Sequence, residues 1–482
     1  MSSDQHAPSA LFDAERFRRA GHGLVDLLAD HLARSLGEGR SPILPRGTPT
    51  EVAARFGARF PARAEADVVD VVRRVLDDAI AVHDPRFIGH QVAPPLPEAA
   101  LMDLASSLLA NGMAVFEMGK AGVAMERAVL RFLSEAVGYD DGAGGVLTHG
   151  GSLGNLTALL AARQATGLDV WHRGVKDAPP LAVVVAESAH YSVARAARIL
   201  GIGTTGILSV PCDADSRMRP DALASILDDA KKRGVRPIAV VAQAGSTGTG
   251  AFDPLSAIAD VCAPRGVWLH VDGAHGASMV LSRERRALTE GIARADSVVW
   301  DMHKMLMMPA LQTAVLFKDA AHGARAFAQE AGYLFHDDDD EAWADVGKRT
   351  IECTKRMLAL PMFATLTAHG TDVLADHVDG VCNRAASLAR RVRARSTMEL
   401  LTEPMCNIVC FRVRGLTPGQ QAAVRRQLVD DGRFYIVHMR VQGSLWLRAV
   451  VLHPRTTDAD LDALLDDVER IARGLPGVLA GT

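Results

Sequence analysis

The stretch Ser297-Val-Val-Trp-Asp-Met-His-Lys-Met-Leu-Met-Met-Pro309 places a lysine, Lys304, among apolar residues just after a short run of β-branched and aromatic residues. Continuous apolarity from Val298 to Trp300 is typical of a strand that is covered on both faces. In an open α/β sheet, ligands collect beyond the carboxyl ends of such strands. An amine in these surroundings can act as a nucleophile toward a carbonyl. Most lysines are solvated surface residues, so a functional role for Lys304 needs support from other residues of the sequence.

Three earlier apolar runs, at 181–185, 238–241 and 267–271, alternate with helical patterns and predict a parallel sheet at the centre of the chain. Polar residues follow these runs as they follow the last one. Asp272 stands directly after the third run, 304 − 272 = 32 positions before Lys304. A helix-like segment at 282–294 lies between them, and this length suits one strand-helix-strand crossover. We therefore expect Asp272 and Lys304 on neighbouring strands.

The length of 482 residues exceeds one simple core and predicts three structural units. Helical spacing near the start predicts an N-terminal helical arm over 1–84. The alternating strands and helices predict a large α/β domain over 85–356. Apolar runs at 408–413, 434–437 and 444–451, followed by a helical pattern at 458–472, predict a small α+β domain over 357–482.

Composition indicates an ordinary water-soluble protein, with 48% hydrophobic and 23% charged residues. The net charge of −4 gives no electrostatic reason to expect nucleic acid as a partner. No secretory leader and no run long enough to span a bilayer is evident, so we expect a cytoplasmic location without membrane contact. The six cysteines lack Cys-x-x-Cys spacing, which argues against a zinc site and a disulfide framework.

A glycine-rich turn, Thr148-His-Gly-Gly-Ser-Leu-Gly-Asn155, leads into an apolar helical pattern. Gly150 and Gly151 permit close backbone approach, Ser152 offers a hydroxyl, and the amide groups of a helix start attract an anion. The turn alone is weak evidence, since an ordinary glycine turn capped by Ser152 fits equally well. A phosphate group is nevertheless a suitable occupant.

A lysine amine, a carboxylate, a flat side chain and a phosphate site are what pyridoxal 5′-phosphate (PLP) requires. Lys304 would form the internal aldimine, Asp272 would hydrogen-bond the pyridinium nitrogen, and His190 would stack on the ring. The phosphate would be positioned by Ser152 and His303, with Ser246 as a further candidate.

Four segments in order carry a family resemblance: 145–155, Ser188-Ala-His-Tyr-Ser192, His270-Val-Asp-Gly-Ala-His-Gly276 and Asp301-Met-His-Lys304. They resemble the group II PLP-dependent amino-acid decarboxylases, which include the aromatic-amino-acid, glutamate, cysteine-sulfinate and diaminobutyrate enzymes. The resemblance implies fold type I, the aspartate aminotransferase-like architecture. It also implies a homodimer with active sites at the interface and N-terminal helices wrapped around the partner chain.

The resemblance also implies roles for single residues. The expected cofactor site comprises Gly151, Ser152, His190, Ser246, Asp272, Ala274, Asp301, His303 and Lys304. Tyr333 matches the loop tyrosine that protonates the quinonoid carbon after carbon dioxide leaves, and joins Lys304, His190 and Asp272 as the expected catalytic set. Candidates for substrate binding are Arg448, which would hold a carboxylate, together with Lys120, His90 and Gln91.

The predicted activity is decarboxylation of an L-amino acid to the corresponding amine and carbon dioxide, and several alternatives stay open. Oxidative decarboxylation to an aldehyde is one, although aldehyde-forming relatives typically carry Phe where this chain has Tyr333. Aminotransferase activity and a non-catalytic PLP-binding regulator are others. A metal enzyme would use His270, Asp272, His275, Asp301 and His303, but would leave Lys304 and the glycine turn without a role. His149, Lys120, Met305 and His275 depart from the family pattern and leave the substrate undetermined.

Overall fold

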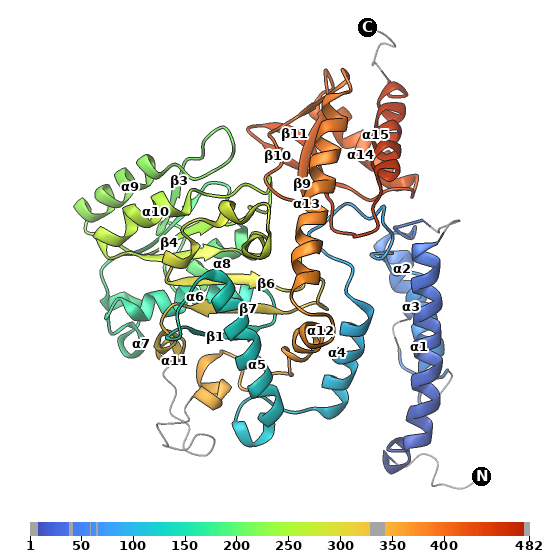
Figure 1. Ribbon diagram of the computed structural model, residues 1–482, viewed down its shortest axis with the longest axis horizontal. Helices are drawn as coiled ribbons and strands as arrows, with labels where there is room; N and C mark the ends of the chain where they lie inside the picture. The colour runs from blue at the N-terminus through green and yellow to red at the C-terminus, as the bar shows by residue number, and fades with distance from the viewer. Residues whose placement is uncertain (1–7, 38–41, 58, 64–65, 328–342, 477–482) are drawn as a thin grey trace.

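A seven-stranded sheet forms the centre of the molecule (Figure 1). The computed structural model describes residues 8–37, 42–57, 59–63, 66–327 and 343–476. The strand order is β1-β7-β6-β5-β4-β2-β3; β7 runs antiparallel to β1 and β6, and every other pair is parallel. The strands are β1 (Gly144–Thr148), β2 (Leu181–Ala186), β3 (Ile207–Val210), β4 (Arg236–Gln243), β5 (Trp268–Asp272), β6 (Ser297–Asp301) and β7 (Thr313–Phe317).

Helices cover both faces of this sheet, as the continuous apolarity of its strands predicts. Val184 belongs to one buried cluster with residues of α5, α9 and α10, whereas Val183 and Val185 belong to a second cluster with residues of α6, α8 and α11. Alternate residues of β2 therefore face opposite layers. The helices of the region are α4 (Pro97–Leu109), α5 (Phe116–Val137), α6 (Gly151–Ala165), α7 (Val170–Arg173), α8 (Tyr191–Ile199), α9 (Pro220–Lys232), α10 (Leu255–Cys262) and α11 (Ala321–Phe327).

The connection from β5 to β6 differs from the sequence prediction. In place of a helix over 282–294, it contains three short 3-10 turns, at Gly276–Leu281, Arg286–Thr289 and Ile292–Arg294. Gly291 has a φ of +93°, and a Cβ there would lie 2.5 Å from the backbone nitrogen of Ser256. The backbone at Gly291 therefore has a conformation and a close contact with Ser256 that a regular helix would not allow. The two strands are still parallel neighbours, with Asp272 opposite Val299.

The C-terminal part of the chain forms a second, antiparallel sheet with the order β10-β11-β9-β8. Three helices share its core and bury Leu388, Leu428 and Leu464 in one cluster with Phe411 of β9. The elements are β8 (Met398–Leu400), β9 (Ile408–Val413), β10 (Val437–Val441), β11 (Ser444–Val450), α13 (Asp372–Arg393), α14 (Pro418–Asp430) and α15 (Asp458–Arg473). The preceding helix, α12 (Leu360–His369), packs on α4 and α5 instead.

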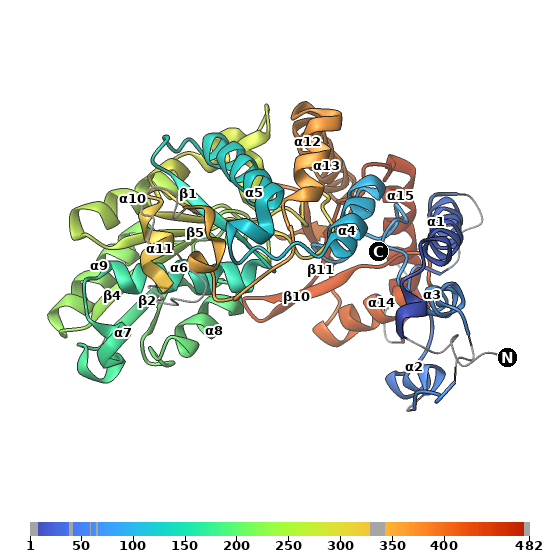
Figure 2. The ribbon, with the colours of Figure 1, turned by 90° about the horizontal axis from the view of Figure 1, so that it is seen from below.

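Helices α1 (Ala14–Leu36), α2 (Pro49–Phe56) and α3 (Val68–Leu76) lie at one edge of the molecule, where α1 packs along α3 (Figures 1 and 2). The sequence pattern missed α2, which Thr48 and Glu51 start with a capping box. The domain limits at 84 and 356 stay predictions. Among the described residues, no helix combines the length and the apolarity needed to cross a membrane.

Candidate active site

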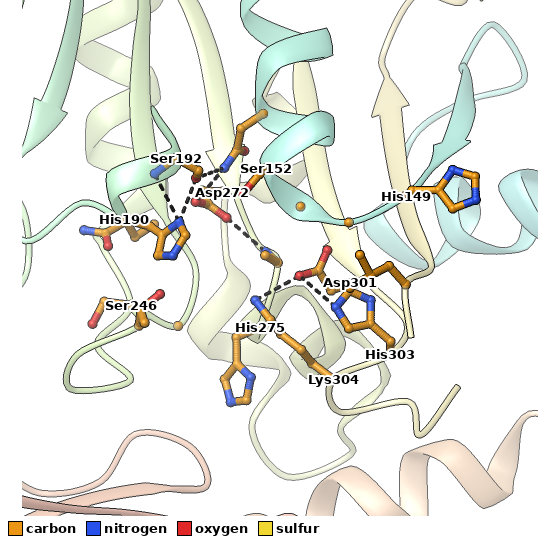
Figure 3. A pocket seen from close by; sticks show the side chains of 18 residues that line it. His149, Ser152, His190, Ser192, Ser246, Asp272, His275, Asp301, His303 and Lys304 are labelled. Carbon is orange, nitrogen blue, oxygen red and sulfur yellow. Dashed lines mark hydrogen bonds and ion pairs between the residues drawn. The ribbon is translucent and has the colours of Figure 1, made fainter. Parts of the chain in front are cut away.

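A cavity of about 280 Å³ opens at the carboxyl ends of the central strands. All nine residues predicted to bind the cofactor line it, and Figure 3 shows most of them around one space. Asp272 ends β5, Asp301 ends β6, and His303 and Lys304 follow in the next turn. His190 comes from the start of α8, and Gly151 and Ser152 come from the start of α6.

The turn after β6 brings Lys304 into the cavity. Met302, Met305 and Leu306 are completely buried, which anchors the turn, whereas the Lys304 side chain keeps 19% of its surface exposed. The Lys304 Nζ atom lies 2.9 Å from Asp301 Oδ2. The apolar residues around the lysine in the sequence therefore hold the backbone, and the amine itself faces the cavity.

Asp301 is the buried counter-charge of this amine. The Thr313 hydroxyl donates a hydrogen bond to Asp301 Oδ1, and His303 Nε2 lies 3.8 Å from Oδ2. Burial alone would raise the pKa of the Asp301 carboxyl, but the charges of Lys304 and His303 and these hydrogen bonds hold that pKa below its ordinary value. Asp301 therefore stays ionised beside Lys304.

Asp272 presents a second carboxylate to the cavity from the neighbouring strand. The Asn155 side-chain amide donates to Asp272 Oδ2 over 3.0 Å, and the Ala274 backbone N–H donates to Oδ1 over 3.2 Å. Both donors fix the orientation of the carboxylate. Ala274 also accepts a hydrogen bond from the Asp301 backbone N–H, which ties the two strand ends together.

His190 caps the N-terminus of α8 and turns its ring toward the cavity (Figure 3). Its Nδ1 atom accepts the Ser192 backbone N–H over 3.3 Å and lies 2.7 Å from the Ser192 hydroxyl. Burial lowers the pKa of His190, with Lys304 acting in the same direction and Asp272 and Asp301 opposing it. The flat imidazole ring is therefore neutral at neutral pH, and Ser192 holds it through the Nδ1 atom.

The start of α6 has the form of an anion site. Gly150 precedes the helix with a φ of +96°, and no side chain caps the helix, so its first N–H groups are left for another partner. A Cβ on Gly151 would lie 3.0 Å from both carboxylate oxygens of Asp301, which shows how closely this backbone approaches the Lys304 turn. The donor set here fits a phosphate.

Ser246 and His303, two other residues predicted to contact the phosphate, already form hydrogen bonds within the protein. Ser246 Oγ accepts the Ala251 backbone N–H over 3.2 Å and lies 3.0 Å from Thr249 Oγ1, so it shapes the loop after β4. In Figure 3 it lies on the side of His190, away from His303. His303 Nδ1 accepts the Gln312 backbone N–H over 3.1 Å, which orients its ring.

The predicted substrate residues are not brought into this cavity within one chain. Lys120 is exposed on α5, and His90 and Gln91 lie in the segment between α3 and α4. Arg448 is buried on β11, where its Nε donates to the Gly248 carbonyl over 2.9 Å. Tyr333 lies outside the described residues.

Sequence reasoning missed Asn155, Ser192 and Gln243 as lining residues, whereas His275, named there as a candidate metal ligand, does line the cavity. Asn155 lies one helical turn after Gly151, and a polar residue on the apolar face of a helix was the signal that could have marked it. His275 is buried against the small domain, where its Nε2 lies 2.7 Å from Asn407 Oδ1, and burial lowers its pKa to about 3. The contact with Asn407 was not predicted, because the two residues are 132 positions apart and no local pattern indicates the pairing.

Over the described ranges, no group of three or more His, Cys, Asp or Glu residues is arranged to hold a metal ion. His270, a candidate ligand in the metal-enzyme alternative, has both ring nitrogens engaged. Its Nδ1 lies 2.8 Å from Ser297 Oγ and its Nε2 lies 2.9 Å from Asn155 Oδ1.

Comparison with known proteins agrees with this geometry. A family model described as the pyridoxal-dependent decarboxylase conserved domain matches residues 49–414. Human cysteine sulfinic acid decarboxylase is 32% identical over 435 residues, covering 86% of this chain and 88% of that protein. The bovine acidic amino acid decarboxylase GADL1 is 31% identical over 424 residues, covering 84% and 80%.

Solved structures agree on the architecture. The crystal structure of mouse CSAD matches with a TM-score of 0.90 at 28% identity, covering 96% of this chain and all of that one. The structure of Oryza sativa TDC with PLP and tryptamine matches with a TM-score of 0.88 over 96% and 98% of the two chains. At 23% identity, this second match shows the fold alone.

The chain therefore belongs to the pyridoxal-dependent decarboxylase family, and it has the fold type I architecture that its motifs predict. It is a PLP-dependent amino-acid decarboxylase. The cavity fits that cofactor, because it offers an amine, a carboxylate on the adjacent strand and an uncapped helix N-terminus.

Proposed function

We propose that this enzyme converts an L-amino acid to its amine and carbon dioxide with PLP bound covalently to Lys304. The observation that carries the proposal is that the Lys304 amine and the Asp272 carboxylate line one cavity from neighbouring parallel strands. The ring of PLP, when bound, accepts the electron pair that the departing carboxylate leaves behind. Each remaining task falls to side chains of the chain itself.

Four residues would divide these tasks. Asp272 would hold the ring nitrogen in its protonated state, and neutral His190 would form one flat wall of the ring site. The first turn of α6, with Ser152, would bind the phosphate through N–H and O–H donors. Asp301 would hold the Lys304 amine in place through their 2.9 Å contact. For Tyr333 we keep the role of proton donor to the substrate carbon.

Arg448 is the best supported candidate for binding a substrate carboxylate. Its Nη2 atom is buried and has no hydrogen-bond partner among the described residues, and the same holds for Gln91 Nε2. Unpaired buried donors of this kind are costly, so an anion that reached them would be bound favourably. We propose that His90 and Lys120 contribute to the same substrate region.

We propose an acidic L-amino acid as the substrate class. The two curated relatives are named as decarboxylases of cysteine sulfinic acid and of acidic amino acids. The unpaired donors of Arg448 and Gln91 agree with a second acidic group on the substrate. An aromatic substrate is the contrasting outcome.

Product analysis tests this proposal. Purified protein with PLP is incubated with single acidic, aromatic and basic amino acids, while carbon dioxide, amine, ammonia and peroxide are measured. We expect equal amounts of amine and carbon dioxide from an acidic amino acid. Ammonia with peroxide would instead indicate the oxidative reaction, and turnover that requires a 2-oxo acid would indicate an aminotransferase. Lys304→Ala should abolish the activity.

We further propose that the enzyme is a homodimer. Helix α4 exposes Leu101, Leu104 and Leu108, which share one helical face, and α1 and α3 expose a second set of apolar side chains: Phe17, Val25, Leu28, Val68, Val71 and Val75. Apolar faces of this extent commonly mark protein interfaces. Light scattering should give the mass of two chains, and Leu104→Asp should weaken the dimer.

A cytoplasmic location is also proposed. All six cysteines of the chain are free, and four of them are buried. Free cysteines suit a reducing compartment. Fractionation of cells that express the tagged full-length chain would test this expectation.

A further inference from the structure

The side-chain amide of Asn155 connects two groups that line the cofactor site, Asp272 directly and His190 through Ser192. Asn155 lies on the buried face of α6 and is 1% exposed. Its Nδ2 atom lies 3.0 Å from Asp272 Oδ2 and 3.0 Å from Ser192 Oγ, and its Oδ1 atom lies 2.9 Å from His270 Nε2. Both N–H bonds and the carbonyl oxygen are therefore used.

The direction of these hydrogen bonds follows from the Asp272 end of the chain, and the Trp268 end is compatible with it. At one end, the Trp268 indole N–H can only donate, and it lies 2.9 Å from Ser297 Oγ. Ser297 Oγ lies 2.8 Å from His270 Nδ1, so its hydroxyl hydrogen is available to that nitrogen. At the other end, the Asp272 carboxylate can only accept, so Asn155 must turn its NH₂ group toward it and its oxygen toward His270.

His270 can satisfy both neighbours in one form alone. Burial lowers its pKa to about 4, so the ring is neutral at neutral pH and carries one N–H group. That hydrogen must sit on Nε2, because Asn155 presents an acceptor there and Ser297 presents a donor to Nδ1. The chain of bonds from Trp268 to Asp272 therefore runs in one direction.

A branch of the same chain reaches His190. Because Ser192 Oγ accepts from Asn155, its own hydrogen is free to donate to His190 Nδ1 over 2.7 Å. The Ser192 backbone N–H donates to the same nitrogen over 3.3 Å. His190 therefore carries its hydrogen on Nε2, the ring nitrogen remote from these two donors.

We propose that Asn155 is a positioning residue that sets the orientation of Asp272 and the tautomer of His190 together. The inference rests on the proposed function, in which these two groups contact PLP. A side-chain amide does not ionise at neutral pH, so we expect the chain of bonds to orient its members and not to carry a proton away from the cavity. Its effect is to hold the Asp272 carboxylate in one orientation and the His190 ring in one tautomer where both line the ring site.

Replacement Asn155→Asp gives the sharpest test, because it keeps the shape and reverses the polarity. A second carboxylate would stand about 3 Å from Asp272, and two such groups cannot both remain ionised. The Ser192 hydroxyl would turn from His190 toward the new acceptor. We expect the dissociation constant for PLP to rise at least about tenfold. We also expect the pH profile of the visible absorbance of the bound cofactor to shift.

Asn383→Asp is a surface control for the change of amide to carboxylate. Asn383 is exposed on α13, accepts from Arg285 and does not line the cavity. This variant should keep the wild-type PLP affinity and pH profile. If Asn155→Asp behaves like Asn383→Asp, the inference is wrong.

A second measurement needs no variant to fold. Nitrogen NMR of the histidine-labelled full-length apoprotein reports which ring nitrogen carries hydrogen. We expect His190 and His270 in the Nε2–H form, with His270 still neutral at about pH 6. Finding His270 charged there, or either ring with its hydrogen on Nδ1, would overturn the inference. Failure of wild-type protein to bind PLP would instead refute the proposed function, so the two failures are distinct.

Discussion

Replacing Asp272 by Asn tests the carboxylate that the proposed function needs most. Both Asp272 oxygens accept from donors, namely Asn155 over 3.0 Å and the Ala274 backbone N–H over 3.2 Å. The NH₂ group of an asparagine must therefore face one of these donors. A buried donor left unpaired costs about 1–3 kcal/mol, so the variant should unfold at lower urea concentration even without cofactor.

The loss of charge adds a separate effect on PLP. A hydrogen bond to a charged group contributes about 1.5–3 kcal/mol, which corresponds to about a 10- to 150-fold increase in the PLP dissociation constant. The assay is titration of apoprotein with PLP, followed by the visible absorbance of the bound cofactor. Decarboxylase activity should fall further than affinity, because the ring nitrogen would no longer be held in its protonated state.

Asp379→Asn is the matched control for the Asp272 variant. Asp379 lies on α13 and is equally buried, at 9% exposure. It accepts hydrogen bonds from the Ser282 hydroxyl and the Arg283 backbone N–H. Asp379→Asn should lower the free energy of unfolding by no more than Asp272→Asn does, and it should leave PLP affinity unchanged. The reasoning is refuted if Asp272→Asn loses stability like the control but binds PLP within about threefold of the wild type.

Three further predictions concern the cavity floor, a buried ion pair and pH. Gly151→Ala places a Cβ 3.0 Å from both Asp301 oxygens and should weaken PLP binding in the same titration, whereas unchanged affinity would show that the turn yields easily. Lys355→Met leaves the Glu126 carboxylate buried without its 2.7 Å partner and should cost about 3–5 kcal/mol in urea unfolding; adding Glu126→Gln should recover much of this loss. Burial lowers the pKa of His377 to about 3 in the folded protein, whereas an unfolded chain gives about 6.5. The contribution of neutral His377 to the free energy of unfolding is therefore fully present above about pH 6.5 and is lost as the pH falls toward the folded pKa. His377→Leu should therefore remove about 2 kcal/mol of the difference in unfolding free energy between pH 7 and pH 5, and an unchanged difference would count against neutral burial.

Much of the architecture follows from the sequence because its strands are apolar on both faces. The runs that became β2, β4, β5 and β6 lie within one or two residues of their predicted positions. Strand β7 was missed although its residues after Thr313 are apolar and buried. The short strand β3 escaped prediction because it is only partly buried, and β1 because it begins with two glycines. Such strands carry no continuous apolar signal, and they gain their structure from pairing with neighbours.

The cofactor-binding set was accessible from sequence for a related reason. Asp272, Asp301 and Lys304 each follow a recognisable strand, and parallel strands bring their carboxyl ends to one edge. Asn155 was not recognised, because its contacts with Asp272 and His270 join residues more than a hundred positions apart. The false helix at 282–294 has a similar origin, since helical spacing of apolar residues does not reveal that Gly291 packs against Ser256.

The most direct measurement is to reduce the PLP-loaded enzyme with borohydride, digest it and locate the modified peptide by mass spectrometry. We predict a single phosphopyridoxyl group on the ε-nitrogen of Lys304. A modification on another lysine, or no modification of protein that binds PLP and turns over substrate, would contradict the central claim.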